Sequence, residues 1–209
     1  MWQLQRRFYT TFPTASCVIY SRLRFSPRIH LKEVPMIILE AERLLVRRHI
    51  PADLDDLHAL YSDPDVVRHI PDAPRSREEA KAELDWFLNG HPRRPELGSW
   101  ATIHKPTGRF IGRCGLLPNT IDGQEEVEVA YVFAKEFWGQ GLGTEVAQAL
   151  VRCARAQLGL TRLICMIEPE NLTSARIAVK LGMVFEKEYV DEYGLSRIYA
   201  IEEPADILG

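Results

Sequence analysis

A change of hydrophobic period around a glycine-rich stretch limits most strongly what this chain can fold into. Over residues 126–133 the side chains alternate, which predicts a strand with Val127, Val129 and Tyr131 on one face. From residue 143 the apolar positions follow a helical period up to Gly159, which predicts an amphipathic helix with a glycine stop. Between the two lies Trp138-Gly139-Gln140-Gly141-Leu142-Gly143-Thr144. The sequence therefore predicts a strand, a glycine loop and a helix in direct succession.

The remaining patterns predict a mixed α/β domain over residues 36–203. Further strands are expected at residues 43–48, 100–104, 109–117, 163–167, 185–190 and 197–201, and helices at 51–62, 76–90 and 173–182. Turns at residues 105–108 and at Asp122-Gly123 join the middle strands, so we expect these strands to be antiparallel neighbours. Strands both precede and follow helices, which favours a mixed α/β fold.

The first 35 residues differ from the rest of the chain in charge. The chain holds 26 basic and 29 acidic residues, and six of the basic ones but no acidic one lie within residues 1–32. The other 20 basic and 29 acidic residues give the remainder a net charge of −9. We expect residues 1–35 to be a disordered or dispensable leader, with a mitochondrial transit segment as the alternative for an Arg-rich, acid-free start. Residues 204–209 are expected to form a C-terminal tail.

Composition argues against several other classes of protein. No apolar run reaches the roughly 20 residues that span a bilayer, so no membrane partner is expected. The four cysteines are scattered without a Cys-x-x-Cys pair, so neither a metal site nor a disulfide framework is indicated. A cytoplasmic location is expected, or a mitochondrial one if residues 1–35 are a transit segment. The acidic body would repel phosphates, which argues against nucleic acid as a partner.

The glycine loop indicates a phosphorylated ligand. Glycines at alternate positions let the backbone pass close to a ligand, and N–H groups at a helix start converge on an anion. The loop lacks the Lys-Ser/Thr pair of a triphosphate site, and Thr144 stands where a dinucleotide fingerprint needs its last glycine. A turn that merely joins strand to helix is the alternative for a bare glycine motif.

These residues resemble the GNAT acetyltransferases. The resemblance is carried by Val127-Glu128-Val129-Ala130-Tyr131, by the run from Phe137 to Glu145, by Asn171-Leu172-Thr173-Ser174 and by Lys180-Leu181-Gly182-Met183. Segments at residues 39–44, 100–103 and 107–112 are similar as well, so the resemblance covers residues 37–201 and is closest to the branch that acetylates ribosomal-protein N-termini. It implies a largely antiparallel sheet of about six or seven strands flanked by about four helices, with a cofactor cleft between the central strands.

The resemblance implies that acetyl-CoA is the co-substrate. Its pyrophosphate would lie on the backbone N–H groups of residues 140–144, and its amide-rich pantetheine arm would pair with the strand that ends at Val132 and Phe133. The implied cofactor-binding residues are Val132, Phe133, Trp138, Gly139, Gln140, Gly141, Leu142, Gly143, Thr144 and Asn171. Many family members carry Arg or Gln where this chain has Trp138, so the backbone amides are expected to bind the phosphates here.

Glu128 and Ser174 are the candidate catalytic residues. An amine must lose its proton before it attacks a thioester, and a carboxylate can take that proton directly or through water. Glu128 faces away from Val127 and Val129, toward the expected cofactor cleft; a solvated strand glutamate is the alternative. By resemblance, Ser174 lies near the cofactor sulfur, where a hydroxyl could stabilise the leaving thiolate. Many family members have a tyrosine seven residues after the asparagine that corresponds to Asn171, but Ala178 occupies that position here.

The acceptor is expected to be a primary amine. Acidic residues at positions 122, 125, 126 and 128 crowd one turn and strand, which favours a cationic acceptor. At pH 7 roughly 10 to 20% of an α-amine is neutral, against well under 0.1% of a lysine, so a single carboxylate suits the α-amino group of a protein or peptide. A polyamine, an amino acid, an aminoglycoside-like amine and a non-catalytic acyl-CoA-binding module are the alternatives. Both a monomer and a homodimer agree with the sequence.

Several aromatic and histidine residues are left without a firm role. Trp86, Trp100, Tyr131, Phe137 and Tyr193 are candidates either for the wall of an acceptor cleft or for the core. His58, His69 and His104 have no partner that a sequence can show, so no role is assigned to them.

Overall fold

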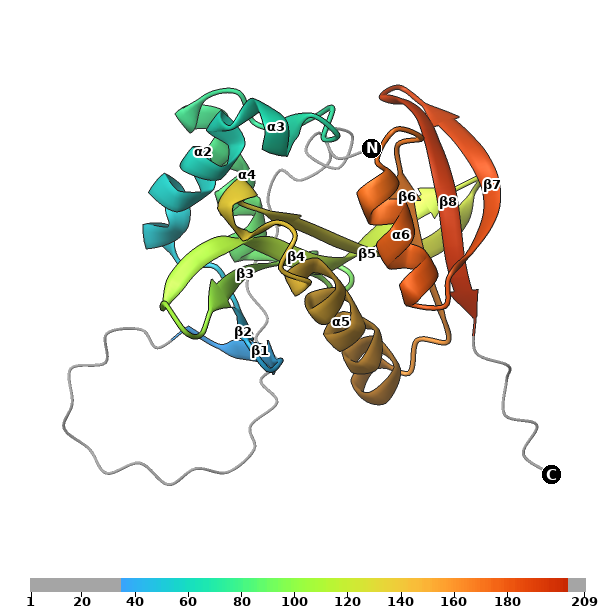
Figure 1. Cartoon of the computed structure of the whole chain (residues 1–209), viewed down its shortest axis with the longest axis horizontal. Helices are drawn as coiled ribbons and strands as arrows, with labels where there is room; N and C mark the ends of the chain where they lie inside the picture. Colours follow the sequence, from blue (N-terminus) through green and yellow to red (C-terminus); the bar gives the residue numbers. More distant parts are fainter. Residues whose placement is uncertain (1–34, 203–209) are drawn as a thin grey trace. The chain divides into compact units, whose positions relative to one another are not determined.

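One eight-stranded sheet organises residues 35–202, which are the residues that the computed structural model describes (Figure 1). Its strands are β1 (Ile37–Glu40), β2 (Leu44–Arg47), β3 (Gly98–His104), β4 (Arg109–Ile121), β5 (Gln124–Phe133), β6 (Arg162–Ile167), β7 (Val184–Asp191) and β8 (Gly194–Glu202). Their order across the sheet is β1-β2-β3-β4-β5-β6-β8-β7. Each predicted strand is present, and β1 adds an eighth, which pairs antiparallel with β2 at the edge of the sheet.

Five α-helices lie in the described part of the chain, where about four were expected. They are α2 (Leu54–Ser62), α3 (Pro64–Val67), α4 (Arg77–Asn89), α5 (Leu142–Leu158) and α6 (Leu172–Lys180), with 3₁₀ turns η1 (Pro51–Asp53) and η2 (Lys135–Phe137). The additional helix is α3, a single turn. Pro64 ends α2 as predicted, but it also begins α3, because Asp63 accepts the N–H of Asp65 and caps the new turn.

Helices cover both faces of the sheet, as two neighbouring residues of β4 show. The guanidinium of Arg113 lies over the rings of Tyr61 in α2 and Phe87 in α4. Cys114 instead belongs to the main hydrophobic core, together with Val146 and Leu150 of α5. Successive side chains of a strand point to opposite faces, so α2 and α4 cover one face and α5 covers the other.

The long hairpin of β4 and β5 forms the centre of the sheet. Its turn is the predicted Asp122-Gly123, and both residues have positive φ, 50° and 79°, as the tightest hairpin turns require. Pairing runs from Ile121 opposite Gln124 to Gly112 opposite Phe133. The expected antiparallel arrangement of β3, β4 and β5 is confirmed.

The pairing of β5 with β6 is short and parallel. Among the described residues it consists of one register position, Glu128 opposite Ile164. β6 then pairs antiparallel with β8 along its whole length. The backbone of β5 beyond Glu128 therefore runs on toward the glycine loop without a β6 ladder beside it.

Two expected segments cannot be compared with the structure. The predicted leader (residues 1–35, except for Pro35 itself) and the tail (residues 204–209) lie outside the described residues. Within residues 35–202, no helix is both long and apolar enough to cross a membrane.

Candidate active site

The glycine loop connects the end of β5 to the first turn of α5. Gly139 and Gly141 have φ values of 72° and 78°, in the left-handed region where an L side chain is strained. Gly141 is the N-cap residue, so the amides of the first turn have no carbonyl partner within α5. The 17-residue helix adds the positive end of its dipole at the same place. The loop therefore has the geometry of an anion site.

Gly143, the third glycine of the motif, lacks a side chain for a structural reason that Gly139 and Gly141 do not share. A Cβ on Gly143 would lie 3.1 Å from Cδ1 of Ile177 and 3.4 Å from Cε2 of Tyr131. Gly143 does not have positive φ, unlike Gly139 and Gly141. The missing side chain of Gly143 therefore also lets β5, α5 and α6 pack together.

Arg43 supports the glycine loop from the turn between β1 and β2. Its backbone N–H and its Nε donate to the two carboxylate oxygens of Glu145, each over 2.7 Å. Its Nη1 donates to the carbonyl of Gln140 over 3.0 Å, and its Nη2 lies 3.7 Å from where a Cβ on Gly141 would stand. Sequence reasoning missed this residue, because nothing in the spacing links position 43 to a loop about 100 residues later.

Trp138 binds back onto the end of β5. Its indole Nε1 donates to the carbonyl of Phe133 over 2.7 Å, while the residue stays 47% exposed. The ring therefore stands at the entrance of the glycine loop in a fixed orientation, and it brings no charge there.

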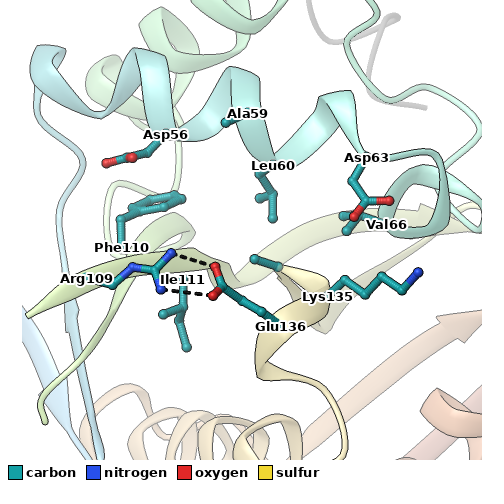
Figure 2. Close-up of a pocket in the computed structure, with 11 residues that line it drawn as sticks. Asp56, Ala59, Leu60, Asp63, Val66, Arg109, Phe110, Ile111, Lys135 and Glu136 are labelled. Carbon is teal, nitrogen blue, oxygen red and sulfur yellow. Dashed lines mark hydrogen bonds and ion pairs between the residues drawn. The ribbon is translucent and has the colours of Figure 1, made fainter. Parts of the chain in front are cut away.

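The 3₁₀ turn η2, which leads into the glycine loop, is held by ion pairs on the α2 side of the sheet. Arg109 of β4 binds both carboxylate oxygens of Glu136, over 2.9 and 2.5 Å (Figure 2). Lys135 binds Asp65 of α3. A cavity of about 530 Å³ opens beside these pairs. It is lined by Asp56, Ala59, Leu60, Asp63, Val66, Arg109, Phe110, Ile111, Ala134, Lys135 and Glu136.

This cavity lies well away from the predicted base. Ala134 follows Glu128 by six residues along β5, which corresponds to about 20 Å at roughly 3.3 Å per strand residue. The cavity therefore adjoins the start of the glycine loop and is not an acceptor site beside Glu128.

Glu128 is half-buried on the face of the sheet that α2 and α4 cover. Val127 and Val129 point into the core beneath α5, so the predicted orientation of Glu128 is confirmed, while its role stays a prediction. Burial raises the pKa of Glu128 to about 7. Hydrogen bonds from the Asn119 side chain, over 2.7 Å, and from the backbone of Met166 act against this rise in pKa.

Two further charged residues act on the pKa of Glu128 in opposite directions. Arg113, on the same face of β4, favours the ionised carboxylate, whereas Asp72, from the loop before α4, opposes it. A carboxyl group that is half protonated near neutral pH can both accept and return a proton, as general base catalysis requires.

Two of the four acidic residues at positions 122, 125, 126 and 128 are held in ion pairs, which sequence reasoning did not foresee. Asp122 binds Lys187 of β7 over 2.7 Å, and Glu126 binds Arg162 of β6 over 3.0 Å. These ion pairs reduce the negative field that the run was expected to direct at a cationic acceptor.

Asn171 and Ser174 occupy the start of α6, as predicted. The Asn171 side chain accepts the backbone N–H of Ser174 over 3.1 Å and so caps the helix. Burial raises the pKa of Tyr131 on β5, and the nearby Ser174 side chain acts against this rise. Ala178, one turn further along α6, is buried in the core.

The remaining aromatic candidates are mostly structural. Trp100 and Phe137 belong to the core, and Trp86 packs edge-on against Phe87. Tyr131 is partly buried and packs against the core on the face opposite Glu128, which agrees with the second of its two predicted alternatives. Tyr193 lies in the turn between β7 and β8, far along the sheet order from β5.

Two histidines acquire partners in the fold. Nδ1 of His69, in the loop before α4, lies 2.8 Å from Oε2 of Glu168 in the loop after β6. Nδ1 of His104 lies 3.0 Å from the Thr107 hydroxyl, within its own hairpin turn. Across residues 35–202, no group of three or more His, Cys, Asp or Glu side chains is arranged to hold a metal ion.

Comparisons with known proteins agree with this geometry. A family model described as an acetyltransferase (GNAT) domain matches residues 43–184. An uncharacterized N-acetyltransferase, p20, from Bacillus licheniformis is 30% identical over 165 residues, which cover 78% of this chain and 88% of p20.

Solved structures share the fold. A GNAT-family acetyltransferase from Bacillus anthracis superposes with a TM-score of 0.66 at 25% identity, covering 78% of this chain and 96% of its own. RimL, a ribosomal L7/L12 α-N-protein acetyltransferase solved in complex with coenzyme A, superposes with a TM-score of 0.65 at 18% identity, covering 81% and 99%. At such low identity, the likeness to RimL shows the fold alone.

Proposed function

Since this chain belongs to the GNAT acetyltransferase family and is an acyl-CoA-dependent N-acetyltransferase, we propose that it transfers an acetyl group from acetyl-CoA to the α-amino group of a protein or peptide. The family membership rests on a model that matches residues 43–184, which include both β5 and the glycine loop.

The pyrophosphate of acetyl-CoA binds the glycine loop in this proposal. Backbone N–H groups of residues 140–144 face the anion, since the first turn of α5 offers them no carbonyl partner. Arg43 keeps the loop in shape through Gln140 and Glu145. Trp138 completes the entrance without a charge, so the amides and the helix dipole carry the phosphate binding.

The pantetheine arm lies along β5 between Glu128 and the loop. Two carbonyls of this stretch already accept side-chain donors, Val129 from the Cys165 thiol and Phe133 from Trp138. The backbone of Tyr131 between them, flanked by Val132, is the place where the amides of the arm can pair with the strand. This assignment places the thioester near Glu128, where the β5–β6 ladder ends.

Glu128 acts as the general base. Its carboxyl, with a pKa of about 7, is about half ionised at neutral pH and close in proton affinity to an α-amine of pKa about 8. It takes the proton of the acceptor ammonium, and the neutral amine then attacks the thioester carbonyl. This raised pKa, at the end of the β5–β6 pairing, is the observation that carries the proposed role.

An α-amine suits this site better than a polycation. Asp122 and Glu126 are held in ion pairs with Lys187 and Arg162, so they offer little attraction to a polyamine or an aminoglycoside-like amine. The fold shared with RimL supports a protein N-terminus as the acceptor, although it is a likeness of fold alone.

A panel of acceptors tests the proposal. Thiol release from acetyl-CoA would be followed with short peptides that have a free N-terminus and no lysine, with N-terminally blocked peptides that contain lysine, and with a polyamine. We expect turnover with the first group and little with the other two. Turnover only with the polyamine, or only with the blocked lysine peptides, would refute the α-amine assignment while leaving the acetyltransferase activity intact.

A further inference from the structure

A short segment around α3 is tied to the ends of two parallel strands. At its start, the Asp65 carboxylate forms an ion pair with Lys135, which lies just beyond the end of β5. At its end, Nδ1 of His69 lies 2.8 Å from Oε2 of Glu168, which directly follows β6. Residues 65–69, named here the α3 strap, are therefore fixed to both strands at the edge of the sheet where these parallel strands end.

The α3 strap crosses the place where β5 and β6 separate. Among the described residues the two strands share one register position, Glu128 opposite Ile164, and beyond it they run to their ends without a ladder between them. In the proposed function, the pantetheine arm and the thioester occupy this opening. Ligands of parallel sheets bind in the crevice beyond the carboxyl ends of the strands. A segment that bridges these two ends therefore lies over such a crevice.

The α3 strap lies on the face of the sheet to which Glu128 points. Val66 of the strap lines the cavity together with Leu60 of α2, and α2 covers this face (Figure 2). Asp72, which follows the strap by three residues, acts on the charge of Glu128. The hydrophobic core beneath α5 occupies the opposite face, so the acceptor amine must approach Glu128 from the side of the strap.

The two ends of the α3 strap differ in their exposure to solvent. The side chains of His69 and Glu168 are 24% and 30% exposed, whereas those of Lys135 and Asp65 are 56% and 49% exposed. Exposed ion pairs contribute little, and a better shielded pair with a short hydrogen bond contributes more. An imidazole can donate from Nδ1 to a carboxylate in its neutral and in its protonated form. The β6 end therefore holds the strap more firmly than the β5 end.

We propose that the His69–Glu168 pair holds the α3 strap over the β5–β6 opening as a wall of the acceptor site, so that both are positioning residues for the acceptor. This inference rests on the proposed function. A strap released from β6 would have to be ordered again whenever an acceptor binds, at a cost in conformational entropy. Loss of the pair therefore weakens acceptor binding. The glycine loop, which binds the cofactor in the proposed function, does not depend on it.

Steady-state kinetics of His69→Ala, Glu168→Ala and the double variant test this inference. With the lysine-free peptide that the wild type acetylates best, each single variant should raise the acceptor KM by roughly three- to fivefold, as expected for one partly exposed ion pair. The double variant should be no worse than either single one, since both remove the same bond. We expect kcat to change less than about twofold and the calorimetric Kd for acetyl-CoA to stay the same. A merely structural role would lower the melting temperature without this selective rise in KM.

Limited digestion with trypsin reports the position of the α3 strap without any acceptor. Arg68 lies between the two tethered residues, so cleavage after it should become faster when the β6 end is released. Asp85→Ala is the matched control, because it removes an ion pair with Lys81 on α4 and leaves the strap tethered. It should change neither the acceptor KM nor the cleavage rate.

An unchanged acceptor KM in both single variants would overturn the inference, whatever the result with trypsin. Increases in KM that multiply in the double variant would overturn it as well, because they would show two independent roles. If the wild type acetylates only a polyamine, that amine replaces the peptide in the same comparison, and only the α-amine assignment is lost. A wild-type chain that acetylates no amine would instead overturn the proposed function, and the trypsin comparison would still decide whether the pair holds the strap.

Discussion

Arg43 and Glu145 lie 102 residues apart in the chain and are joined by two hydrogen bonds of 2.7 Å. One uses the backbone N–H of Arg43 and the other its guanidinium, so the Glu145 carboxylate binds the β1–β2 turn at two points. The same guanidinium reaches the carbonyl of Gln140. The first turn of α5 and the glycine loop are thus held in one arrangement by a residue from the far edge of the sheet.

Arg43→Ala should weaken acetyl-CoA binding, because the glycine loop loses its support on both sides of Gly141. Hydrogen bonds to charged groups are worth roughly 1.5 to 3 kcal/mol, so we expect a 10- to 100-fold rise in Kd by calorimetry. The turnover number at saturating cofactor should fall much less. Arg77→Ala, which removes an exposed ion pair with Asp55, serves as the control. An unchanged Kd in Arg43→Ala would show that the loop keeps its shape without this residue.

Gly141→Asp should abolish cofactor binding, because it puts a side chain and a negative charge where the phosphates are expected. Gly159→Asp is a matched control at the other end of the same helix, with φ of 64° against 78° for Gly141. Both variants impose a similar backbone strain, roughly 1 to 2 kcal/mol. Comparable losses in melting temperature, with binding lost only in Gly141→Asp, are the expected result. Full affinity in Gly141→Asp would refute the pyrophosphate assignment.

Local patterns predicted the parts of the fold that depend on neighbours in sequence. Three of these patterns depend only on residues close together in the sequence, and each is found in the structure. They are the alternation over residues 126–133, the Asp122-Gly123 turn and the stop at Gly159. The short elements β1 and α3 were missed because four residues carry too little periodicity to be distinguished from loop.

The site was predictable as a set of positions but not as a set of contacts. Periodicity showed that Glu128 and Tyr131 lie on opposite faces, yet not which helix covers each face. The pairing of Asp122 with Lys187, and the packing of Tyr131 beside α5 and α6, depend on strand order and on how the helices pack, which no local pattern encodes. The same holds for the raised pKa of Glu128, since its burial is produced by distant segments.

A chain that begins at Met36 should fold and retain full activity. The carbonyl of Met36 accepts the N–H of Arg48 over 2.8 Å, and β1 starts at the next residue, so the truncation keeps every β1–β2 contact described here. Melting temperatures of the two chains would be compared by calorimetry, together with kcat/KM. A decrease of more than about 4 °C, which corresponds to roughly 1 kcal/mol for a domain of this size, would show that residues 1–35 stabilise the domain.

Glu128→Gln should lower turnover by roughly 10²-fold at pH 7 while leaving acetyl-CoA affinity unchanged, as expected for loss of a general base. In the wild type, kcat/KM should rise as pH increases through about 7, because the base must be ionised. The defect of the variant should shrink toward pH 8 and above, where more of the α-amine is already neutral. If Glu128 only attracts a cationic acceptor, KM should rise with kcat intact, and added salt should imitate the substitution.

The same substitution should stabilise the fold in a pH-dependent way. The pKa of Glu128 is about 7 in the folded protein, against an ordinary value of 4.5, so folding favours the protonated carboxyl. Its contribution to stability is fully present below about pH 4.5 and is lost as pH rises through 7. A rise of about 2.5 pH units corresponds to roughly 3 kcal/mol at pH 8, at about 1.4 kcal/mol per unit.

Glutamine avoids that loss, and its side-chain carbonyl can still accept from Asn119. Denaturant unfolding at pH 5 and pH 8 should therefore show Glu128→Gln gaining roughly 2 kcal/mol on the wild type between the two pH values, with the exposed Glu125→Gln on the same strand as the control. An equal stability difference at both pH values would mean that Glu128 ionises in the fold as easily as in the unfolded chain, and the case for it as a base tuned by burial would fail.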